Sequence, residues 1–276
     1  LDALLWLKSQ GRLRDCWLHT TDADVRLGTD YFETPANSGA GTSKCAAAAL
    51  IHPWHHVPQT PELAQAALDY ELRLRHHAAG LRFADSRYGF VTIGSTMAVD
   101  SWAYAAVRGM PKRPAAEDFY FLNKLAKVGG VAHGGGAVEI SARISDRVPF
   151  GTGASLGKAA QGVPPLCYAP KIFDWLKIVI AGLDEAVSSG IALKLDHPDE
   201  RFHAGVQERG LAEITLEITA SGLSATQRKR RLHDTFDAFA TLKLMHAWRN
   251  TGLVDMPVAD ALAASPWFSE QPPKGD

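Results

Sequence analysis

The chain has 276 residues, of which 46% are hydrophobic and 21% are charged, and its net charge is −1. This composition is typical of a globular protein with a normal core, and it argues against a general nucleic-acid-binding protein, which shows a basic excess. The 3 cysteines form no Cys-x-x-Cys pair, which argues against a cysteine zinc site. Sparse cysteines favour a reducing compartment, the cytoplasm. No segment reaches the ~20 apolar residues that span a bilayer.

The first elements alternate between helix and strand. The chain opens on Leu1 within an amphipathic helical pattern that Gly11 ends, so we expect the natural N-terminus to lie upstream. Residues 16–20, CWLHT, predict a short buried strand. Residues 44–54 favour a second strand, although their alanine content leaves a helix open.

The middle of the chain continues this alternation. Residues 60–80 predict a helix with Thr60 as its cap and Gly80 as its stop. A β-rich segment, FVTIGSTMAVD, precedes a short helix over about 101–107. A strong helix is predicted within 113–130, and VEISARIS alternates as a strand does.

From about residue 164 the pattern becomes helical, with long helices predicted over 170–189 and 224–250. We therefore predict an α/β core over residues 1–160 and a mainly helical region over 161–276. The sequence shows no internal repeat and no low-complexity tract.

Two carboxylates, Asp22 and Asp24, follow the first predicted strand. Ligand sites in open α/β sheets lie at the carboxyl ends of strands, and Mg²⁺ or Mn²⁺ prefers oxygen ligands completed by water and substrate phosphates. The pair therefore suits a metal-bound diphosphate. The alternative is an Asx turn, in which Asp22 bonds its own backbone.

Four segments in this order resemble a bacterial family 2 glycosyltransferase of the GT-A type. They are WLHTTDADVRLGTDYF, YELRLRHHAAGLRF, IGSTMAVDSWAYAAVRGMPKRPAAEDFYFLNKLAKVGG and SARISDRVPFGTGAS, and the resemblance covers about residues 1–158. It implies a GT-A-like, Rossmann-like mixed sheet flanked by helices and lacking its N-terminal strands. No Gln-x-x-Arg-Trp motif of processive synthases is present, so a single sugar addition is expected.

The resemblance also implies roles for individual residues. Asp22 and Asp24 match the Asp-x-Asp that holds Mn²⁺ or Mg²⁺ and the donor diphosphate. Asp118 matches the base that takes the acceptor proton, with Glu117 supporting it, although acids at a helix start also serve the helix dipole alone. Gly94 and Ser95 match the wall beneath the transferred sugar.

The implied function is metal-dependent, inverting transfer of a sugar from a nucleotide-sugar donor to a glycan or lipid-linked acceptor. The alternatives are another nucleotide-sugar enzyme, such as a nucleotidyltransferase, and an inactive GT-A-like binding module. The glycine-rich segment RVPFGTGASLGK is not a P-loop, but it can approach the diphosphate with Arg143 or Arg147; a surface turn is the simpler interpretation.

Three further features favour structural interpretations. We interpret His52, His55 and His56 as loop histidines rather than zinc ligands. The cluster QRKRR at 227–231 is interpreted as a solvated face, with contact to anionic lipid head groups as the alternative. Trp102 and Tyr104 fit core packing as well as stacking on an acceptor sugar.

Overall fold

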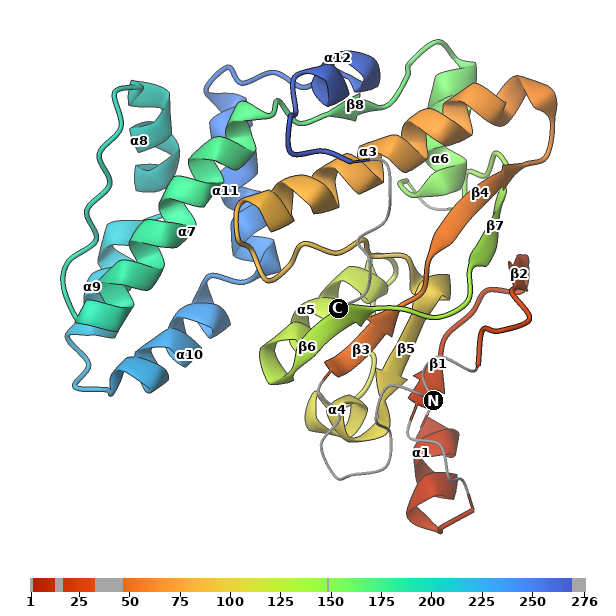
Figure 1. The fold of residues 1–276 in the computed structure, drawn as a ribbon, viewed down its shortest axis with the longest axis horizontal. Helices are drawn as coiled ribbons and strands as arrows, with labels where there is room; N and C mark the ends of the chain where they lie inside the picture. The colour runs from red at the N-terminus through yellow and green to blue at the C-terminus, as the bar shows by residue number, and fades with distance from the viewer. Residues whose placement is uncertain (1, 13–16, 33–46, 148, 270–276) are drawn as a thin grey trace. The chain divides into compact units, whose positions relative to one another are not determined.

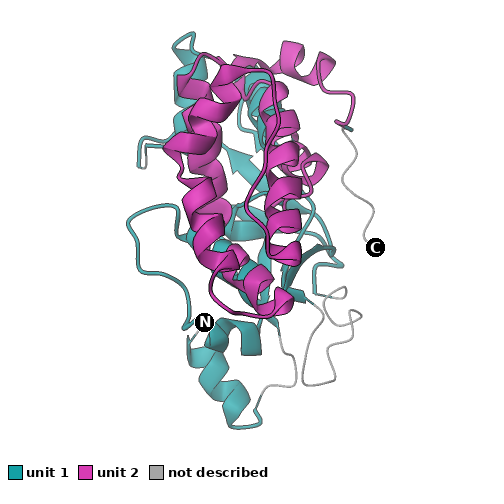
Figure 2. Ribbon diagram, turned by 90° about the vertical axis from the view of Figure 1, so that its left-hand side faces the viewer, with its two compact units in different colours: residues 1–75, 90–165, 269–276 teal, residues 76–89, 166–268 magenta. Residues whose placement is uncertain are grey.

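The computed structural model describes residues 2–12, 17–32, 47–147 and 149–269. It has a mixed α/β architecture in which helices flank mixed sheets (Figure 1). The chain divides into two compact units, and Figure 2 colours unit 1 teal and unit 2 magenta. Unit 1 contains residues 1–75 and 90–165, and unit 2 contains residues 76–89 and 166–268. The segment 76–89 therefore belongs to the helical unit, although it lies inside the predicted α/β core.

The main sheet of unit 1 has four strands in the order β1-β5-β3-β6. Their bounds are Trp17–His19 for β1, Ala47–Ile51 for β3, Met97–Asp100 for β5 and Gly130–His133 for β6. β5 runs antiparallel to β1 and β3, whereas β6 runs parallel to β3. The carboxyl ends of β1, β3 and β6 therefore share one edge of the sheet with the start of β5.

A second sheet of unit 1 has three strands in the order β2-β7-β4. The strands are β2 (Val25–Leu27), β4 (Trp54–Pro58) and β7 (Val138–Ala142). The helices of unit 1 are α1 (Asp2–Ser9), the 3₁₀ turns η1 (Pro61–Leu63) and η2 (Gly94–Thr96), the first part of α3 (Ala64–Phe83), α4 (Ser101–Ala106), α5 (Glu117–Val128) and α6 (Thr152–Ala160).

Unit 2 is mainly helical. It contains α7 (Lys171–Ser189), α8 (Glu200–Glu208), α9 (Leu211–Thr219), α10 (Ala225–Thr235), α11 (Ala238–Asn250), α12 (Val258–Ala263) and the short pair β8 (Leu166–Cys167) and β9 (Met256–Pro257). Its core gathers the fully buried rings of Phe173, Phe202 and Trp248 on one face of each helix. Gly190 ends α7 in the left-handed region at φ 71°, a conformation that glycine adopts without strain.

Several predicted boundaries are wrong for identifiable reasons. The predicted helix over 224–250 is two helices, because Asp237 accepts hydrogen bonds from the backbone N–H groups of Phe239 and Ala240 and starts α11. Thr60 precedes η1 but makes no side-chain capping bond. Gly80 does not end the helix that follows, because α3 continues to Phe83 and Gly80 packs closely against the Phe173 ring. The helix predicted within 113–130 begins only at Glu117.

Other elements follow the sequence pattern more closely. Residues 47–51 form a strand despite their alanines, because β3 pairs with β5 and β6 on its two sides. The sequence carries no strong signal for four elements, and these were not predicted: β2, β4, α8 and α9. Among the described helices, none combines the length and the apolar character that crossing a bilayer requires.

Candidate functional site

Three predicted segments meet at the strand-end edge of the main sheet. The hydroxyl of Thr20, the residue after β1, donates a hydrogen bond to the carbonyl oxygen of Gly94 at 2.6 Å. A Cβ atom built on Gly94 would lie 3.8 Å from Asp118 Cβ and 4.0 Å from Asp118 Oδ2. Asp22 lies two positions after Thr20, so their Cα atoms lie within about 7 Å. The loop that carries the acidic pair therefore starts beside Asp118.

We call Thr20, Asp22, Asp24, Gly94, Ser95 and Asp118 the strand-end site. Its members come from the loop after β1, from the first residues of η2 and from the first turn of α5. Thr20 is a member that the sequence analysis did not single out. Its signal is a polar residue placed directly after a buried strand, where the backbone turns toward the next strand.

Burial makes Asp118 a stronger proton acceptor than an exposed aspartate. Burial is the main cause that raises the pKa of its carboxyl, and the negative charge of Glu117 raises it further. The N–H group of Phe119, 2.7 Å from Asp118 Oδ1, and the N–H group of Gly94 oppose this rise. The net shift is upward. Burial thus outweighs the effect of the helix N-terminus, which favours an ionised carboxylate.

The backbone that leads into Asp118 is strained. Ala116, which precedes α5, has φ 59° and ψ 23°, in the left-handed region that alanine rarely adopts. No side chain caps this helix start. Strained residues of this kind persist where the surrounding structure holds them, and they gather at functional sites.

The two carboxylates of the acidic pair have different environments. Asp22 is exposed, and its side chain makes no hydrogen bond with the described residues. Asp24 Oδ2 accepts hydrogen bonds from Arg143 Nε at 3.0 Å and from Arg143 Nη2 at 2.8 Å. Neither carboxylate bonds its own backbone within the described chain, so the Asx-turn alternative has no support.

The acidic pair supplies two potential metal ligands. Within the described ranges, no group of three or more His, Cys, Asp or Glu side chains is arranged to hold a metal ion. Carboxylate oxygens fit Mg²⁺ or Mn²⁺, and Mg²⁺ commonly takes one or two carboxylates and completes its shell with water and phosphate oxygens. The donor set therefore fits such an ion, with Arg143 as a competing cation for Asp24.

The remaining predicted donor-binding residues are divided between buried and exposed positions. Ser95 is 1% exposed, and its Oγ atom has no hydrogen-bond partner among the described residues. Arg147 is exposed, and its backbone N–H donates to Ser145 Oγ at 3.4 Å. No hydrogen bond or ion pair of the described structure joins the Arg147 guanidinium to the strand-end site. Arg143, not Arg147, reaches it.

A histidine cluster that the sequence analysis missed borders the same edge. Tyr31 stacks on His52 with ring centroids 4.0 Å apart, and His19 lies 5.1 Å from Tyr31. His52 is buried rather than in a loop exposed to solvent, and burial, with a smaller effect of His19, lowers its pKa to about 4. His52 is therefore neutral at pH 7. Gly135 approaches its ring closely, since a Cβ there would lie 2.1 Å from His52 Nδ1.

His52 lies in the short connection between β3 and β4, as predicted, but the other two histidines of this segment are strand residues. β4 contains His55 and His56, and the burial of Trp54 and His56 alternates with exposed neighbours. The residue types WHHVP do not alternate in the same way, so the sequence carries no period-of-two signal for this strand. His55 is 3.7 Å from Glu139 at the surface, whereas His56 is buried.

The two candidate stacking residues near the site differ in exposure. Tyr104 is 4% exposed and its hydroxyl donates to Asp2 Oδ1, so it belongs to the packed structure of unit 1. Trp102 is 57% exposed on α4. Only Trp102 thus has a free ring face for a sugar.

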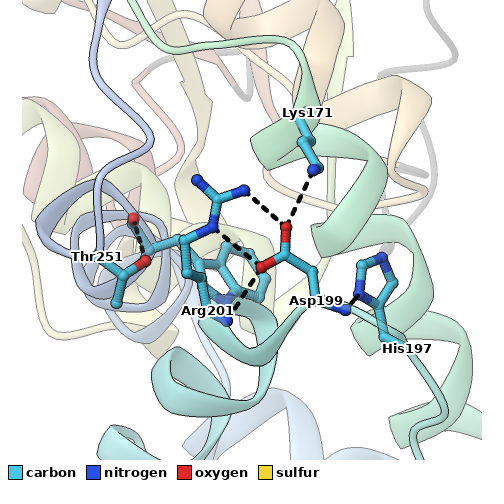
Figure 3. Close-up of polar contacts among 6 residues, drawn as sticks. Lys171, His197, Asp199, Arg201 and Thr251 are labelled. Carbon is cyan, nitrogen blue, oxygen red and sulfur yellow. Dashed lines mark hydrogen bonds and ion pairs between the residues drawn. The ribbon is translucent and has the colours of Figure 1, made fainter.

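A polar cluster in unit 2 has a structural role (Figure 3). Asp199 caps α8 by accepting from the N–H of Arg201, and its carboxylate also binds the Arg201 guanidinium and Lys171 Nζ. The hydrogen bonds from Arg201, opposed by burial and aided by Lys171, hold the pKa of Asp199 well below its usual range. All of its bonding capacity is used inside unit 2.

The basic cluster QRKRR is also largely engaged within unit 2. Arg228 donates to the carbonyl oxygens of Val187 at 2.6 Å and Ser188 at 3.2 Å, at the end of α7. Lys229 pairs with Asp184 at 3.0 Å and Arg231 with Glu217 at 3.7 Å. Arg228 therefore stabilises a helix end, although not the helix that carries it. Contact with lipid head groups stays an untested alternative.

Comparison of the chain with family models, with curated proteins and with solved structures found no significant match. The interpretation of the site therefore rests on its own residues and geometry.

Proposed function

We propose that unit 1 is the catalytic core of a GT-A-type glycosyltransferase. It would move a sugar from a nucleotide-sugar donor to an acceptor hydroxyl with inversion. The observation that carries this proposal is the meeting of Thr20, Gly94 and Asp118, which brings the start of the acidic loop next to a partly buried carboxylate. A metal-binding pair beside a base is what this reaction requires.

In the proposed reaction, Asp118 takes the proton of the acceptor hydroxyl as that oxygen attacks the anomeric carbon. Its raised pKa suits this role, because a carboxyl with a higher pKa binds the transferred proton more tightly. Gly94 lets the sugar wall approach Asp118, since a larger residue would place a side chain at this contact. Attack opposite to the leaving group inverts the anomeric carbon.

Asp22 and Asp24 would hold the divalent ion at the donor. When bound, Mg²⁺ or Mn²⁺ supplies positive charge that stabilises the departing diphosphate. Arg143 Nη2 lies 2.8 Å from Asp24 Oδ2. When the metal ion replaces Arg143 beside Asp24, the guanidinium would turn toward the diphosphate oxygens. The acceptor class, a glycan or a lipid-linked sugar, is the one that the family resemblance implies.

The test is calorimetric titration of the full-length protein with UDP or GDP in the presence and absence of Mn²⁺. We expect metal-dependent binding that weakens at least about 10-fold in Asp22→Asn and in Asp24→Asn, since even outer partners of metal ligands contribute that much. Asp85→Asn, which removes an exposed carboxylate of unit 2, is the matched control and should bind like the parent protein. Absence of metal-dependent nucleotide binding would refute the transferase proposal.

Product analysis separates the remaining alternatives. A transferase releases a nucleoside diphosphate, and Asp118→Asn should lower that release at least about 100-fold while leaving nucleotide binding intact. A nucleotidyltransferase would instead release pyrophosphate from a nucleoside triphosphate. An inactive binding module would bind the nucleotide and release neither product.

A further inference from the structure

Unit 1 contains a second group of catalytic residue types, made of Thr152, His56 and Glu71. We call these residues the Thr152 triad. His56 Nε2 lies 3.0 Å from Thr152 Oγ1 at hydrogen-bond distance, whereas His56 Nδ1 lies 3.4 Å from Glu71 Oε2, within ion-pair distance but without hydrogen-bond geometry. The side chains come from α6, β4 and α3, so residues far apart in sequence converge here. A hydroxyl, an imidazole and a carboxylate in this order are the signature of an activated nucleophile.

The carboxylate of the triad is held in its ionised form. Burial alone would raise the pKa of Glu71, but the nearby His56 side chain and the hydrogen bonds from the His56 backbone N–H and from Arg75 lower it overall. The backbone N–H of His56 is 2.9 Å from Glu71 Oε2, and Arg75 Nη2 is 2.7 Å from Glu71 Oε1. An ionised Glu71 favours the proton of His56 on Nδ1. His56 Nε2 is then free to accept the proton of the Thr152 hydroxyl.

The exposure of the triad suits a nucleophile. The His56 side chain is 1% exposed and that of Glu71 is 14% exposed, so the base and its partner are shielded from water. Thr152 itself is partly exposed. A base that is shielded from water beside a partly exposed hydroxyl residue is an arrangement that nucleophilic catalysis can use.

The backbone around Thr152 adds hydrogen-bond donors. Gly151 has φ 93° and ψ −172°, a conformation that is essentially restricted to glycine, and Thr152 follows it as the first residue of α6. The first N–H groups of a helix have no partner within the helix, so the N–H of Gly153 can bind an oxyanion beside Thr152. Tyr70 also hydrogen-bonds Thr152, and its pKa is raised, mainly by burial, which keeps its hydroxyl protonated.

We propose that Thr152 is the nucleophile of a second site in unit 1, which cleaves carboxylic esters with small acyl groups. The β-methyl group of threonine and the rings of Tyr70 and His56 crowd the attack, which favours short, unbranched acyl chains. This site uses none of the residues of the strand-end site, so the proposal does not rest on sugar transfer.

The reaction has two balanced steps. Thr152 Oγ1 attacks the ester carbonyl while its proton passes to His56 Nε2, and Gly153 N–H and the Tyr70 hydroxyl bind the oxyanion. The tetrahedral intermediate expels the alcohol, which takes the proton from His56 and leaves an acyl ester on Thr152. Water then attacks this ester with His56 as the base, releasing the carboxylic acid and restoring the Thr152 hydroxyl.

The experiment uses the full chain, p-nitrophenyl acetate as substrate and a fluorophosphonate as covalent probe. We expect one fluorophosphonate adduct, located by peptide mass spectrometry at Thr152. Hydrolysis should fall at least about 100-fold in Thr152→Val and in His56→Gln, since each removes the nucleophile or its base. Thr152→Ser keeps the hydroxyl without the methyl group and should retain or exceed the parent activity.

Ser155→Ala, on the same helix, is the matched control and should react like the parent protein. Circular dichroism identifies any variant that fails to fold. If one does, the activity of Thr152→Ser decides, because this variant keeps a hydroxyl beside His56. The proposal is overturned if Thr152 acquires no adduct, if the adduct persists in His56→Gln, or if hydrolysis survives in Thr152→Val. These results would leave nucleotide binding at the strand-end site unaffected.

Discussion

The two units use the same kinds of residue in opposite ways. In unit 1, Asp118 is partly buried beside Gly94, and its pKa is raised, mainly by loss of solvent around the carboxyl. In unit 2, Asp199 is held between Arg201 and Lys171, and its pKa is lowered by their hydrogen bonds (Figure 3). The first arrangement costs stability and provides a proton acceptor, whereas the second stabilises a helix start. The comparison shows that the partners of a carboxylate decide its role more than its residue type.

The largest expected effect is in the aromatic core of unit 2. Trp248 is fully buried and its Nε1–H donates to the carbonyl oxygen of Phe202 at 3.0 Å. Trp248→Ala should lower the free energy of unfolding by about 3–5 kcal/mol through the cavity it leaves. Urea unfolding followed by circular dichroism measures this loss. If it stays below about 1 kcal/mol, unit 2 does not depend on this core.

The next effect concerns the close approach of Gly135 to His52 in unit 1. Gly135→Ala adds a methyl group 2.1 Å from His52 Nδ1 at φ 97° and should cost about 2–3 kcal/mol. Gly162→Ala is the matched control, because Gly162 has φ 82° with no atom within 4 Å of the added group. Thermal unfolding should rank Gly135→Ala as clearly more destabilising. Equal losses would show that backbone strain alone, and not the His52 contact, is involved.

A smaller effect is expected where unit 2 uses charge for structure. Arg228→Ala leaves the carbonyl oxygens of Val187 and Ser188 without their donor and should cost about 1–2 kcal/mol. Arg230→Ala, at an exposed position in the same basic cluster, should change stability by less than about 0.5 kcal/mol. Chemical denaturation compares the two variants directly. Equal values would contradict the helix-end role of Arg228.

The smallest effects are those of the two contrasting aspartates, and they have opposite signs. Because the pKa of Asp118 is raised, ionising its carboxyl destabilises the folded state as the pH rises above the ordinary value of 3.8. Asp118→Asn should therefore raise the melting temperature at pH 7. The lowered pKa of Asp199 gives stability that is present above 3.8 and lost in acid, so Asp199→Asn should lower the melting temperature at pH 7. Both differences should shrink toward pH 3. Melting-temperature changes of the same sign in the two variants would contradict the contrast between Asp118 and Asp199.

The sequence predicted local features best where one helix or strand decides them. The run after Thr60 and the acids Glu117 and Asp118 indicated helices that the structure contains, because apolar periodicity and first-turn acids are local signals. The predicted stop at Gly80 was wrong, since α3 continues to Phe83. β1 and β3 were also predicted, since buried apolar runs at this length favour strands. The break between α10 and α11 was not predicted. An aspartate within an amphipathic pattern is normally an exposed helix residue, and only the structure shows that Asp237 caps α11.

The candidate site was predicted in part for the same reason. The sequence pointed to Asp22, Asp24, Gly94 and Asp118 through the order of motifs, and the structure brings Gly94 against Asp118. The Arg143 contact with Asp24 joins residues 119 positions apart, and the Thr152–His56 contact joins residues 96 apart. Pairings at such separations depend on how strands align, which no local pattern determines.

The strained alanine before α5 limits the conformations of the segment that carries Asp118. Ala116 holds φ 59° at a cost of about 1–2 kcal/mol, which a glycine would largely remove. Glycine would also give the backbone two positions before Asp118 more accessible conformations. In the proposed sugar transfer, alanine at this position would restrict the backbone that presents the Asp118 carboxylate, at a permanent energetic cost.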